Sequence, residues 1–273
     1  MKIIKPQISF VQTELPTEKV RLAYAICYKN ENKIDWKHHT EWIERKIAMG
    51  HASPCEHMRV KVPASIYCDK YTKALAKRSL PYGFTDRVKI YRKRQKEWAA
   101  INVRDWLAIG GRINDINQFE EADDYATVKI ICNRGISHEL VRHREMSFTQ
   151  ESTRYCNYSG SMLFIEQGDV FGDTKGFKAW LKNLVFVWNC RLCNLGYKML
   201  LKLGANPQEA RSVLPNSLKT EIWITGTFNQ WKHFFTLRTA KGAHPQMRLI
   251  ANMILADKNC PEQMKHWNEY KEA

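Results

Sequence analysis

The 273-residue sequence lacks several features that would place it outside the ordinary globular proteins. It has no run of about 18 apolar residues, so a membrane-spanning helix is not expected. Its first 15 residues contain neither an uninterrupted apolar segment nor a small-residue cleavage site, so we expect no signal peptide. It also lacks internal repeats and a Gly/Ser/Pro-rich linker, so no domain boundary is visible. We therefore expect a soluble, cytoplasmic protein that folds as one domain over residues 1–273.

Acidic residues are scarce relative to basic ones, with 28 Asp and Glu against 43 Lys and Arg, for a formal net charge of +15. Such a charge attracts polyanions, which include nucleic acids, nucleotides, phosphorylated cofactors and folates. Charge alone does not choose among these ligands. The eight cysteines lack a secretory context, so we expect reduced thiols. Cys190 and Cys193 form a C-x-x-C pair with no second ligand pair nearby, so no metal site is expected.

Hydrophobic periodicity predicts a mixture of strands and helices, which indicates an α+β or α/β fold. Strands are expected at 3–11, 58–63, 125–132 and 218–226, and helices at 19–27, 34–48, 138–144, 177–203, 206–215, 228–239 and 245–256. Ser137 is expected to cap the helix at 138–144. Gly204 should end the long helix, and Asn206 followed by Pro207 should begin the next one.

The stretch from about 64 to 124 differs from its surroundings in charge. It contains a cluster of basic and aromatic residues at 87–98, made of Arg87, Lys89, Tyr91, Arg92, Lys93, Arg94, Lys96 and Trp98. An acidic patch follows, made of Glu120, Glu121, Asp123 and Asp124. Basic and aromatic residues together are typical of a nucleic-acid surface. A solvated helix face or a cofactor phosphate site would explain the cluster as well.

A second polar stretch, at 142–155, concentrates three arginines, a histidine, two serines and a threonine pair in 14 positions. The arginine fork matches phosphate groups and carbonyl-rich rings. The Ser152 hydroxyl and neighbouring backbone N–H groups would complete a phosphate cradle. The alternative is a surface loop with solvated charges. Arg211 and Arg238 lie downstream, and either of them alone is unremarkable.

The spacing within this stretch resembles the signature of the flavin-dependent thymidylate synthases. The matching residues are Arg142, His143 and Arg144, then Ser152 after seven positions, then Arg154 and Tyr155. Segments at 50–57, 210–215 and 231–248 are similar to other motifs of that family and occur in the same order. The resemblance covers roughly residues 1–63 and 125–260, so the basic stretch at 64–124 is interpreted as an insertion.

The resemblance implies a single-domain α+β fold in which a central mixed or antiparallel sheet is flanked by long helices. It also implies an intertwined homotetramer whose active sites combine several subunits. The implied reaction converts dUMP to dTMP, with 5,10-methylenetetrahydrofolate as the carbon donor and NADPH as the reductant of FAD. The family needs no cysteine nucleophile, which agrees with thiols that show no activating partner in the sequence.

Site residues follow from the resemblance position by position. The residues implied for dUMP are Arg142, Gln150, Glu151, Ser152, Thr153, Arg154, Arg211 and Arg238. Those implied for FAD are Ser53, Glu56, Arg142, His143, Arg144, Thr149, Gln150, Ser152, Thr227, Asn229 and His233. Folate or nicotinamide would approach His51 and Tyr155. The expected catalytic residues are Arg142, Ser152 and Arg238, which act by binding, since an arginine at a uracil carbonyl would stabilise charge developing on the ring.

The sequence departs from the family pattern at two positions. Thr227-Phe228-Asn229 replaces a typical Asn-x-Arg, and the missing charge-assisted bond, worth about 1.5–3 kcal/mol, predicts weaker FAD binding. Glu139 replaces a glutamine found in some members, and a carboxylate only accepts hydrogen bonds, so base preference could differ. Three alternatives stay open: a relative that uses dCMP or makes hydroxymethyl-dUMP, a flavin-free homologue, and a nucleic-acid-binding protein that uses the 87–98 cluster.

Overall fold

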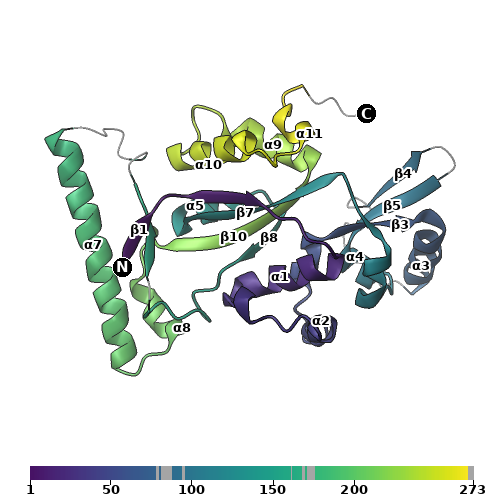
Figure 1. Cartoon of the computed structure of the whole chain (residues 1–273), viewed down its shortest axis with the longest axis horizontal. Coiled ribbons are helices and arrows are strands. Elements are labelled where there is room, and N and C mark those ends of the chain that lie inside the picture. The colour runs from purple at the N-terminus through teal and green to yellow at the C-terminus, as the bar shows by residue number, and fades with distance from the viewer. Residues whose placement is uncertain are drawn as a thin grey trace.

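Helices and strands are mixed along the chain in a computed structural model (Figure 1). The structure describes residues 1–77, 80, 88–93, 96–160, 162–167, 170 and 176–269. The strands are β1 (Lys2–Ile4), β2 (Gln7–Phe10), β3 (Arg59–Pro63), β4 (Lys89–Lys93), β5 (Lys96–Asn102), β6 (Glu120–Glu121), β7 (Tyr125–Asn133), β8 (Ser147–Gln150), β9 (Leu163–Ile165) and β10 (Lys219–Thr227). The α-helices are α1 (Pro16–Tyr28), α2 (His39–Ala48), α3 (Ala64–Ala76), α4 (Val103–Ala108), α5 (Arg134–Leu140), α7 (Phe177–Lys202), α8 (Pro207–Ala210), α9 (Phe228–Arg238), α10 (Pro245–Ala256) and α11 (Glu262–Lys265). Short 3₁₀ helices are η1 (Glu31–Lys33), η2 (Ser53–His57), η4 (Ile113–Gln118) and η5 (Arg211–Val213).

The central sheet is antiparallel, with strand order β2-β7-β10-β8. Its two inner strands, β7 and β10, have nine residues each and pair along their whole length. Alternate residues face opposite sides, so Ile222 and Ile224 pack beneath α9 and α10 whereas Trp223 packs against α1. Figure 1 shows α9, α10 and α11 above the sheet and α1 below it. The predicted α+β fold with a central sheet is confirmed.

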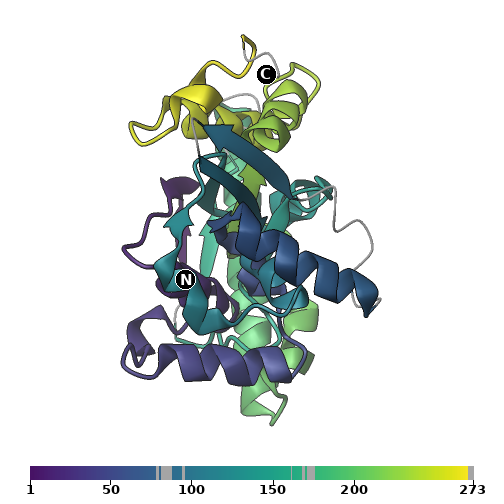
Figure 2. The same ribbon diagram turned by 90° about the vertical axis from the view of Figure 1, so that its right-hand side faces the viewer.

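A second antiparallel sheet has the order β4-β5-β3-β6 and a core of its own. Its buried side chains, among them Val60, Ile101 and Trp106, pack with residues of α1, α2 and α4. Strand β3 lies before the stretch at 64–124 in the sequence, yet it is an inner strand of this second sheet. The stretch at 64–124 therefore packs on the N-terminal segment by pairing with β3. Figure 2 shows the second sheet and α3 from their own side of the molecule.

Buried polar contacts join the two sheets. The Lys19 ammonium of α1 lies 2.7 Å from Glu121 and 3.0 Å from the Tyr125 hydroxyl. The Nδ1 atom of His57 lies 2.7 Å from the Thr225 hydroxyl in β10. Buried polar groups favour arrangements in which they find partners, so these contacts help to fix how the sheets pack, although Nε2 of His57 has no hydrogen-bond partner among the described residues.

Several sequence-predicted elements agree with the structure. The long helix α7 ends just before Gly204, whose φ of +93° is the left-handed conformation common after a helix. The predicted helix at 245–256 is α10, and the strand at 218–226 is β10 shifted by one residue. A capping box at Asn206 and Glu209 begins α8 as expected.

Other predictions were wrong in their boundaries. The single strand at 3–11 is two strands, since Pro6 cannot donate to a ladder: β1 pairs with β9 and β2 with β7. The helix at 34–48 begins only at His39, and the helix at 206–215 is the short α8 followed by η5. Ser137 does not cap a helix; Asn133 caps α5, with its Oδ1 atom 2.8 Å from the Ile136 nitrogen.

Helix α7, the longest of the described helices, is largely exposed. It has 26 residues, and only Ala179, Cys190 and Tyr197 are buried. Large apolar side chains along it are exposed, including Trp180 at 57% and Trp188 at 58%. Figure 1 shows α7 standing to one side of the central sheet. Within the described part of the chain, no helix combines the length and apolar character needed to traverse a bilayer.

Candidate functional site

The signature stretch connects α5 to the edge strand β8 and then runs along the C-terminal end of α1. Strand β8 pairs with β10 from Ser147 to Gln150. Beyond it, the Ser152 nitrogen donates to the Cys27 carbonyl over 3.2 Å. The stretch is therefore held between the central sheet and α1, which fixes the positions of its arginines.

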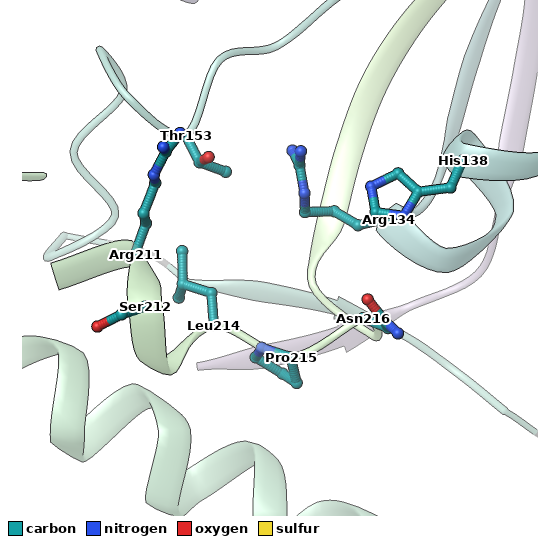
Figure 3. A pocket seen from close by; sticks show the side chains of 8 residues that line it. All are labelled: Arg134, His138, Thr153, Arg211, Ser212, Leu214, Pro215 and Asn216. Carbon is teal, nitrogen blue, oxygen red and sulfur yellow. The ribbon is translucent and has the colours of Figure 1, made fainter. Parts of the chain in front are cut away.

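A pocket of about 320 Å³, called here the arginine pocket, lies beside this stretch (Figure 3). Its lining residues are Arg134, His138, Thr153, Arg211, Ser212, Leu214, Pro215 and Asn216. Figure 3 shows Arg211 reaching up beside Thr153, while Arg134 and His138 enter from α5 on the facing side. None of the described residues that line the pocket is acidic.

The arginine pocket presents unpaired donors. The Nη1 atom of Arg134 is buried and has no hydrogen-bond partner among the described residues. Leaving a buried donor unpaired costs about 1–3 kcal/mol, which a bound anion would recover. Two guanidinium groups around one cavity match the oxygen atoms of a phosphate. The pocket can therefore bind an anion.

The sequence analysis predicted two of the residues that line this pocket. Thr153 and Arg211 were expected at the nucleotide, whereas Arg134 and His138 were missed. A signal for them existed, because residues four apart on a helix share a face. The wrong helix boundary hid it, since α5 begins at Arg134 and not at His138.

A second pocket, called here the histidine pocket, has a volume of about 240 Å³. Its lining residues are Arg142, His143, Arg144, Glu145, Met146, Gln230, His233, Leu237 and Arg238. The signature stretch and α9 thus meet at one cavity. Four of the residues expected at FAD and two of those expected at catalysis come together here, which the sequence pattern alone could not show.

Arg238 is fixed from two sides in the histidine pocket. Its Nε atom donates to Nε2 of His143 over 2.8 Å, and its Nη2 atom donates to the Glu139 carbonyl over 3.2 Å. The Glu139 carboxylate lies 3.6 Å from the Nη1 atom. Burial, with further contributions from Arg238 and His233, lowers the pKa of His143 to about 4. His143 is therefore neutral at pH 7 and can accept the arginine's hydrogen bond.

Two other expected nucleotide residues have their polar groups occupied within the chain. Buried Glu151 accepts from Lys219 over 3.0 Å and from the Tyr158 hydroxyl over 2.9 Å. The Gln150 amide donates to the hydroxyls of Ser137 and Thr220 over 2.8 and 3.0 Å. These bonds tie β8 to its neighbours. Thr149 is buried in the same strand.

The loop after β8 carries further expected residues next to the arginine pocket. The Ser152 hydroxyl accepts from the Arg154 backbone nitrogen over 3.2 Å. The Nε atom of Arg154 donates to the Gln208 side chain over 2.6 Å. Tyr155 is 56% exposed. Because Thr153 belongs to this loop and lines the pocket, Ser152 and Arg154 lie at its border.

The remaining expected residues lie away from both pockets. In and before η2, Ser53 and His51 are exposed, and Glu56 forms an ion pair with Arg104. Thr227 caps α9 through its side chain, and Asn229 occupies the first turn of that helix. The residues expected at FAD are therefore divided, within one chain, between the histidine pocket and other surfaces.

The basic cluster at 87–98 is only partly described, since Arg87 and Arg94 lie outside the described residues. Arg92 pairs with Glu97 at 2.7 Å, and the Tyr91 hydroxyl donates to Asp124 over 3.1 Å. Tyr91 and Trp98 stack with ring centroids 6.2 Å apart. Part of the cluster is therefore neutralised by acidic neighbours.

Comparison with known proteins connects these pockets to a family. The family model described as "Thymidylate synthase complementing protein" matches residues 118–262, which is more than half of the chain. The chain belongs to this family. All residues that line the two pockets lie inside the matched region. The elements α3, β4, β5 and α4 lie before that region in the sequence.

Curated relatives of this family member carry the name "Flavin-dependent thymidylate synthase". The relative from Pyrococcus furiosus is 30% identical over 129 residues, which cover 46% of this chain and 50% of the relative. That from Geobacter sulfurreducens is 33% identical over 124 residues, 45% of this chain and 51% of its own. That from Corynebacterium efficiens is 34% identical over 128 residues, 44% and 51% of the two chains. The chain spans about half the length of the curated relatives it matches.

Proposed function

We propose that this protein is a flavin-dependent thymidylate synthase that methylates dUMP to dTMP. In this proposal 5,10-methylenetetrahydrofolate supplies the carbon, and NADPH supplies reducing equivalents through FAD. The observation that carries the proposal is the arginine pocket, in which Arg134 and Arg211 surround a cavity with no acidic residue among the described residues lining it. The names of the curated relatives support the same activity.

The arginine pocket is proposed to hold the phosphate of dUMP. Arg134 and Arg211 supply charge-assisted hydrogen bonds, and the Thr153 hydroxyl adds a neutral donor. Ser152 and Arg154, at the border of the pocket, complete the set.

Arg238 is proposed to contact a uracil carbonyl. Glu139 and neutral His143 hold its guanidinium before substrate arrives, so little reorganisation is needed when charge develops on the ring. A protonated imidazole at the same place would repel the arginine. The low pKa of His143 therefore keeps Arg238 in position at neutral pH.

The histidine pocket fits the phosphates of FAD. Arg142 and Arg144 are exposed at its rim, and His143 and His233 approach each other with ring centroids 6.0 Å apart. When bound, the flavin would supply the hydride that completes the methyl group. Asn229 stands where the family pattern has arginine, so we expect FAD to bind more weakly than in relatives with that arginine.

No cysteine is assigned a nucleophilic role in this proposal. Cys156, the cysteine nearest the signature stretch, has its pKa raised to about 11 by burial. Burial also raises the pKa of Cys132, in β7, to about 12. A thiol with such a pKa carries almost no thiolate at pH 7 and is a poor nucleophile.

A homotetramer is proposed as the working assembly. Within one chain, the expected FAD residues Ser53 and Glu56 do not reach the histidine pocket, and neighbouring subunits would bring such groups together. The exposed apolar surface of α7 supplies a face for association, because patches of this kind on soluble chains mark interaction sites. Each chain is proposed to act as one domain, with 64–124 as an insertion that packs on the N-terminal helices.

The test is to incubate the purified protein with dUMP, 5,10-methylenetetrahydrofolate, FAD and NADPH, and to identify the nucleotide product by mass. We expect dTMP, and only when FAD and NADPH are both present. Parallel reactions with dCMP serve as a substrate control. A hydroxymethyl product or turnover of dCMP would replace the proposal with the related modifying activity. Unchanged dUMP together with no bound FAD would refute it.

A further inference from the structure

The loop at 151–158, which follows β8, is buried at both ends and exposed in the middle. Its end residues Glu151 and Tyr158 are 2% and 3% exposed, whereas Arg154 and Tyr155 face solvent. Between the ends, Thr153 lines the arginine pocket. Connecting segments usually run over the surface with few fixed contacts, so two buried ends show that this loop is held in place.

A hydrogen bond joins the two ends of the 151–158 loop. The Tyr158 hydroxyl donates to the Glu151 carboxylate over 2.9 Å, although the two residues are seven positions apart. Burial, with a further contribution from Glu151, raises the pKa of Tyr158 well above its ordinary value, so the hydroxyl keeps its proton and remains a donor. A bond from a hydroxyl to a carboxylate is charge-assisted and stronger than one between neutral groups. The bond closes the loop, and Thr153 lies within the closed segment.

Glu151 has further partners that fix it from the side of the central sheet. Its carboxylate accepts from the Lys219 ammonium over 3.0 Å and from the Glu221 nitrogen over 3.3 Å. The Lys29 ammonium lies 3.4 Å away. Glu151 is therefore a fixed point to which Tyr158 attaches the far end of the loop. Removal of the Tyr158 hydroxyl alone leaves this buried carboxylate paired.

Helix α7 supports the far end of the loop from behind. The Tyr158 nitrogen donates to the Tyr197 hydroxyl over 3.3 Å, and the two rings meet edge to face with centroids 6.2 Å apart. Tyr197 is fully buried and packs in one cluster with Tyr158 and Ala210. Leu214, which lines the arginine pocket, packs against the same cluster. Figure 1 shows α7 beside α8. The cluster thus lies behind both walls of the pocket, one from the loop and one from the segment at 211–216.

We propose that Tyr158 is a positioning residue for dUMP, whose hydroxyl closes the 151–158 loop on Glu151 and whose backbone, held by Tyr197, keeps Thr153 at the arginine pocket. The proposal rests on the proposed function, which places the dUMP phosphate in that pocket. Neither tyrosine is among the described residues that line the pocket, so the effect passes through the loop. A loop that is fixed before the ligand arrives loses less conformational entropy on binding, which increases affinity.

The experiment measures binding of dUMP and of deoxyuridine by calorimetry, in the full chain. The variants are Tyr158→Phe and Tyr197→Phe, each of which removes one buried oxygen and keeps the ring. The matched control is Tyr125→Phe, because the buried Tyr125 hydroxyl also donates to a carboxylate, that of Glu121, at the joint between the two sheets. The stability of each variant is measured by denaturant titration, and the KM and kcat for dUMP are measured in turnover.

We expect Tyr158→Phe to weaken dUMP binding about five- to ten-fold, as loss of one well-placed hydrogen bond does. Tyr197→Phe should weaken it about two- to five-fold, since the hydroxyl of Tyr158 still holds the loop. Deoxyuridine, which lacks the phosphate, should bind both variants like the wild type. In turnover the KM for dUMP should rise by the same factors, while kcat at saturating dUMP stays near the wild-type value. Tyr125→Phe should lose stability but bind dUMP normally.

Two results would overturn the positioning proposal while leaving the proposed function intact. One is wild-type dUMP affinity in both Tyr158→Phe and Tyr197→Phe. The other is an equal loss in Tyr125→Phe, or a lower kcat with unchanged KM, because a smaller folded fraction would produce either. If Tyr158→Phe did not fold, Tyr197→Phe would decide, and its normal binding of dUMP would refute the proposal. Failure of the wild type to bind dUMP would instead count against the proposed function.

Discussion

The two sheets of this protein differ in what they contribute to the two pockets. The central sheet is built on nine-residue strands that pair along their whole length, and both pockets are formed by segments that leave it. The second sheet has strands of two to seven residues and contributes no lining residue to either pocket. Long, fully paired strands give the rigid base that charged side chains need in order to be held in place.

The sheets also differ in how polar groups are used. Near the central sheet, arginines such as Arg134 line a pocket, although buried ion pairs such as that of Lys219 with Glu151, at 3.0 Å, occur there too. At the second sheet Arg59 pairs with Asp124 at 3.2 Å, and neither residue lines a pocket. The comparison indicates that the second sheet supports the N-terminal helices, whereas both pockets lie beside the central one.

The largest expected effect comes from removing one large side chain from each core. Trp106 and Trp231 are fully buried, and each indole donates to a backbone carbonyl over 3.1 Å. Changing either to Ala should lower the free energy of unfolding by about 3–5 kcal/mol, measured by denaturant titration. Only Trp231→Ala should also weaken dUMP binding, because α9 carries Arg238. Equal losses of dUMP affinity in the two variants would contradict the inference that only the central sheet supports the pockets.

A smaller effect is expected from the arginine pocket. Arg134→Ala and Arg211→Ala should each weaken dUMP binding by about 1.5–3 kcal/mol, the value of a charge-assisted hydrogen bond. Arg112→Ala, which breaks an exposed pair with Asp115 beside the second sheet, is the control and should bind normally. Calorimetric titration with dUMP and with deoxyuridine distinguishes the cause. If the two arginine variants lost affinity for deoxyuridine as much as for dUMP, the phosphate assignment would fail.

The effect of a change of one pH unit is smaller still. Burial lowers the pKa of His143 to about 4 and that of His57, at the joint between the sheets, to about 3. Between pH 6.5 and 4 these two histidines become protonated in the unfolded chain but stay mostly neutral in the folded protein. Stability should therefore fall as the pH falls, by at most about 1.4 kcal/mol per pH unit for each histidine.

The matched variants for this pH effect are His143→Gln and His57→Gln, each compared with the wild type by thermal unfolding across pH 7 to 4. Each should flatten the pH dependence in that range. In His143→Gln the glutamine can still accept from Arg238, so dUMP binding should change little at pH 7. An unchanged slope in both variants would show that other groups govern acid stability.

The sequence predicted the parts of this fold that depend on local pattern. Alternating β-branched residues in β7 and β10 indicated strands, and a capping box with Gly204 nearby marked helix ends. It also placed Thr153, Arg211, His143 and Arg238 at a functional site through the spacing of the signature. Local chemistry determines the strands and helix ends, so they can be predicted without knowing the fold. The placement of the four site residues came instead from the resemblance to a family, and their roles stay a prediction.

What the sequence could not show depends on contacts between distant segments. The pairing of Arg238 with His143 joins residues 95 positions apart, and no pattern near either one indicates it. Pro6 broke a strand that hydrophobicity alone made continuous. Asn133 and not Ser137 caps α5, because β7 ends at Asn133 and places it at the start of the helix.

The pairing of the first strands constrains how the chain folds during synthesis. β1 pairs in parallel with β9, about 160 positions later, and β2 pairs with β7, about 120 positions later. At about 5–20 residues per second, a ribosome needs roughly 8–30 s to make the partner of β1. Until then β1 has no strand to pair with, although β2 can pair as soon as β7 has been made. The central sheet is complete later still, once β10 at 219–227 has been translated.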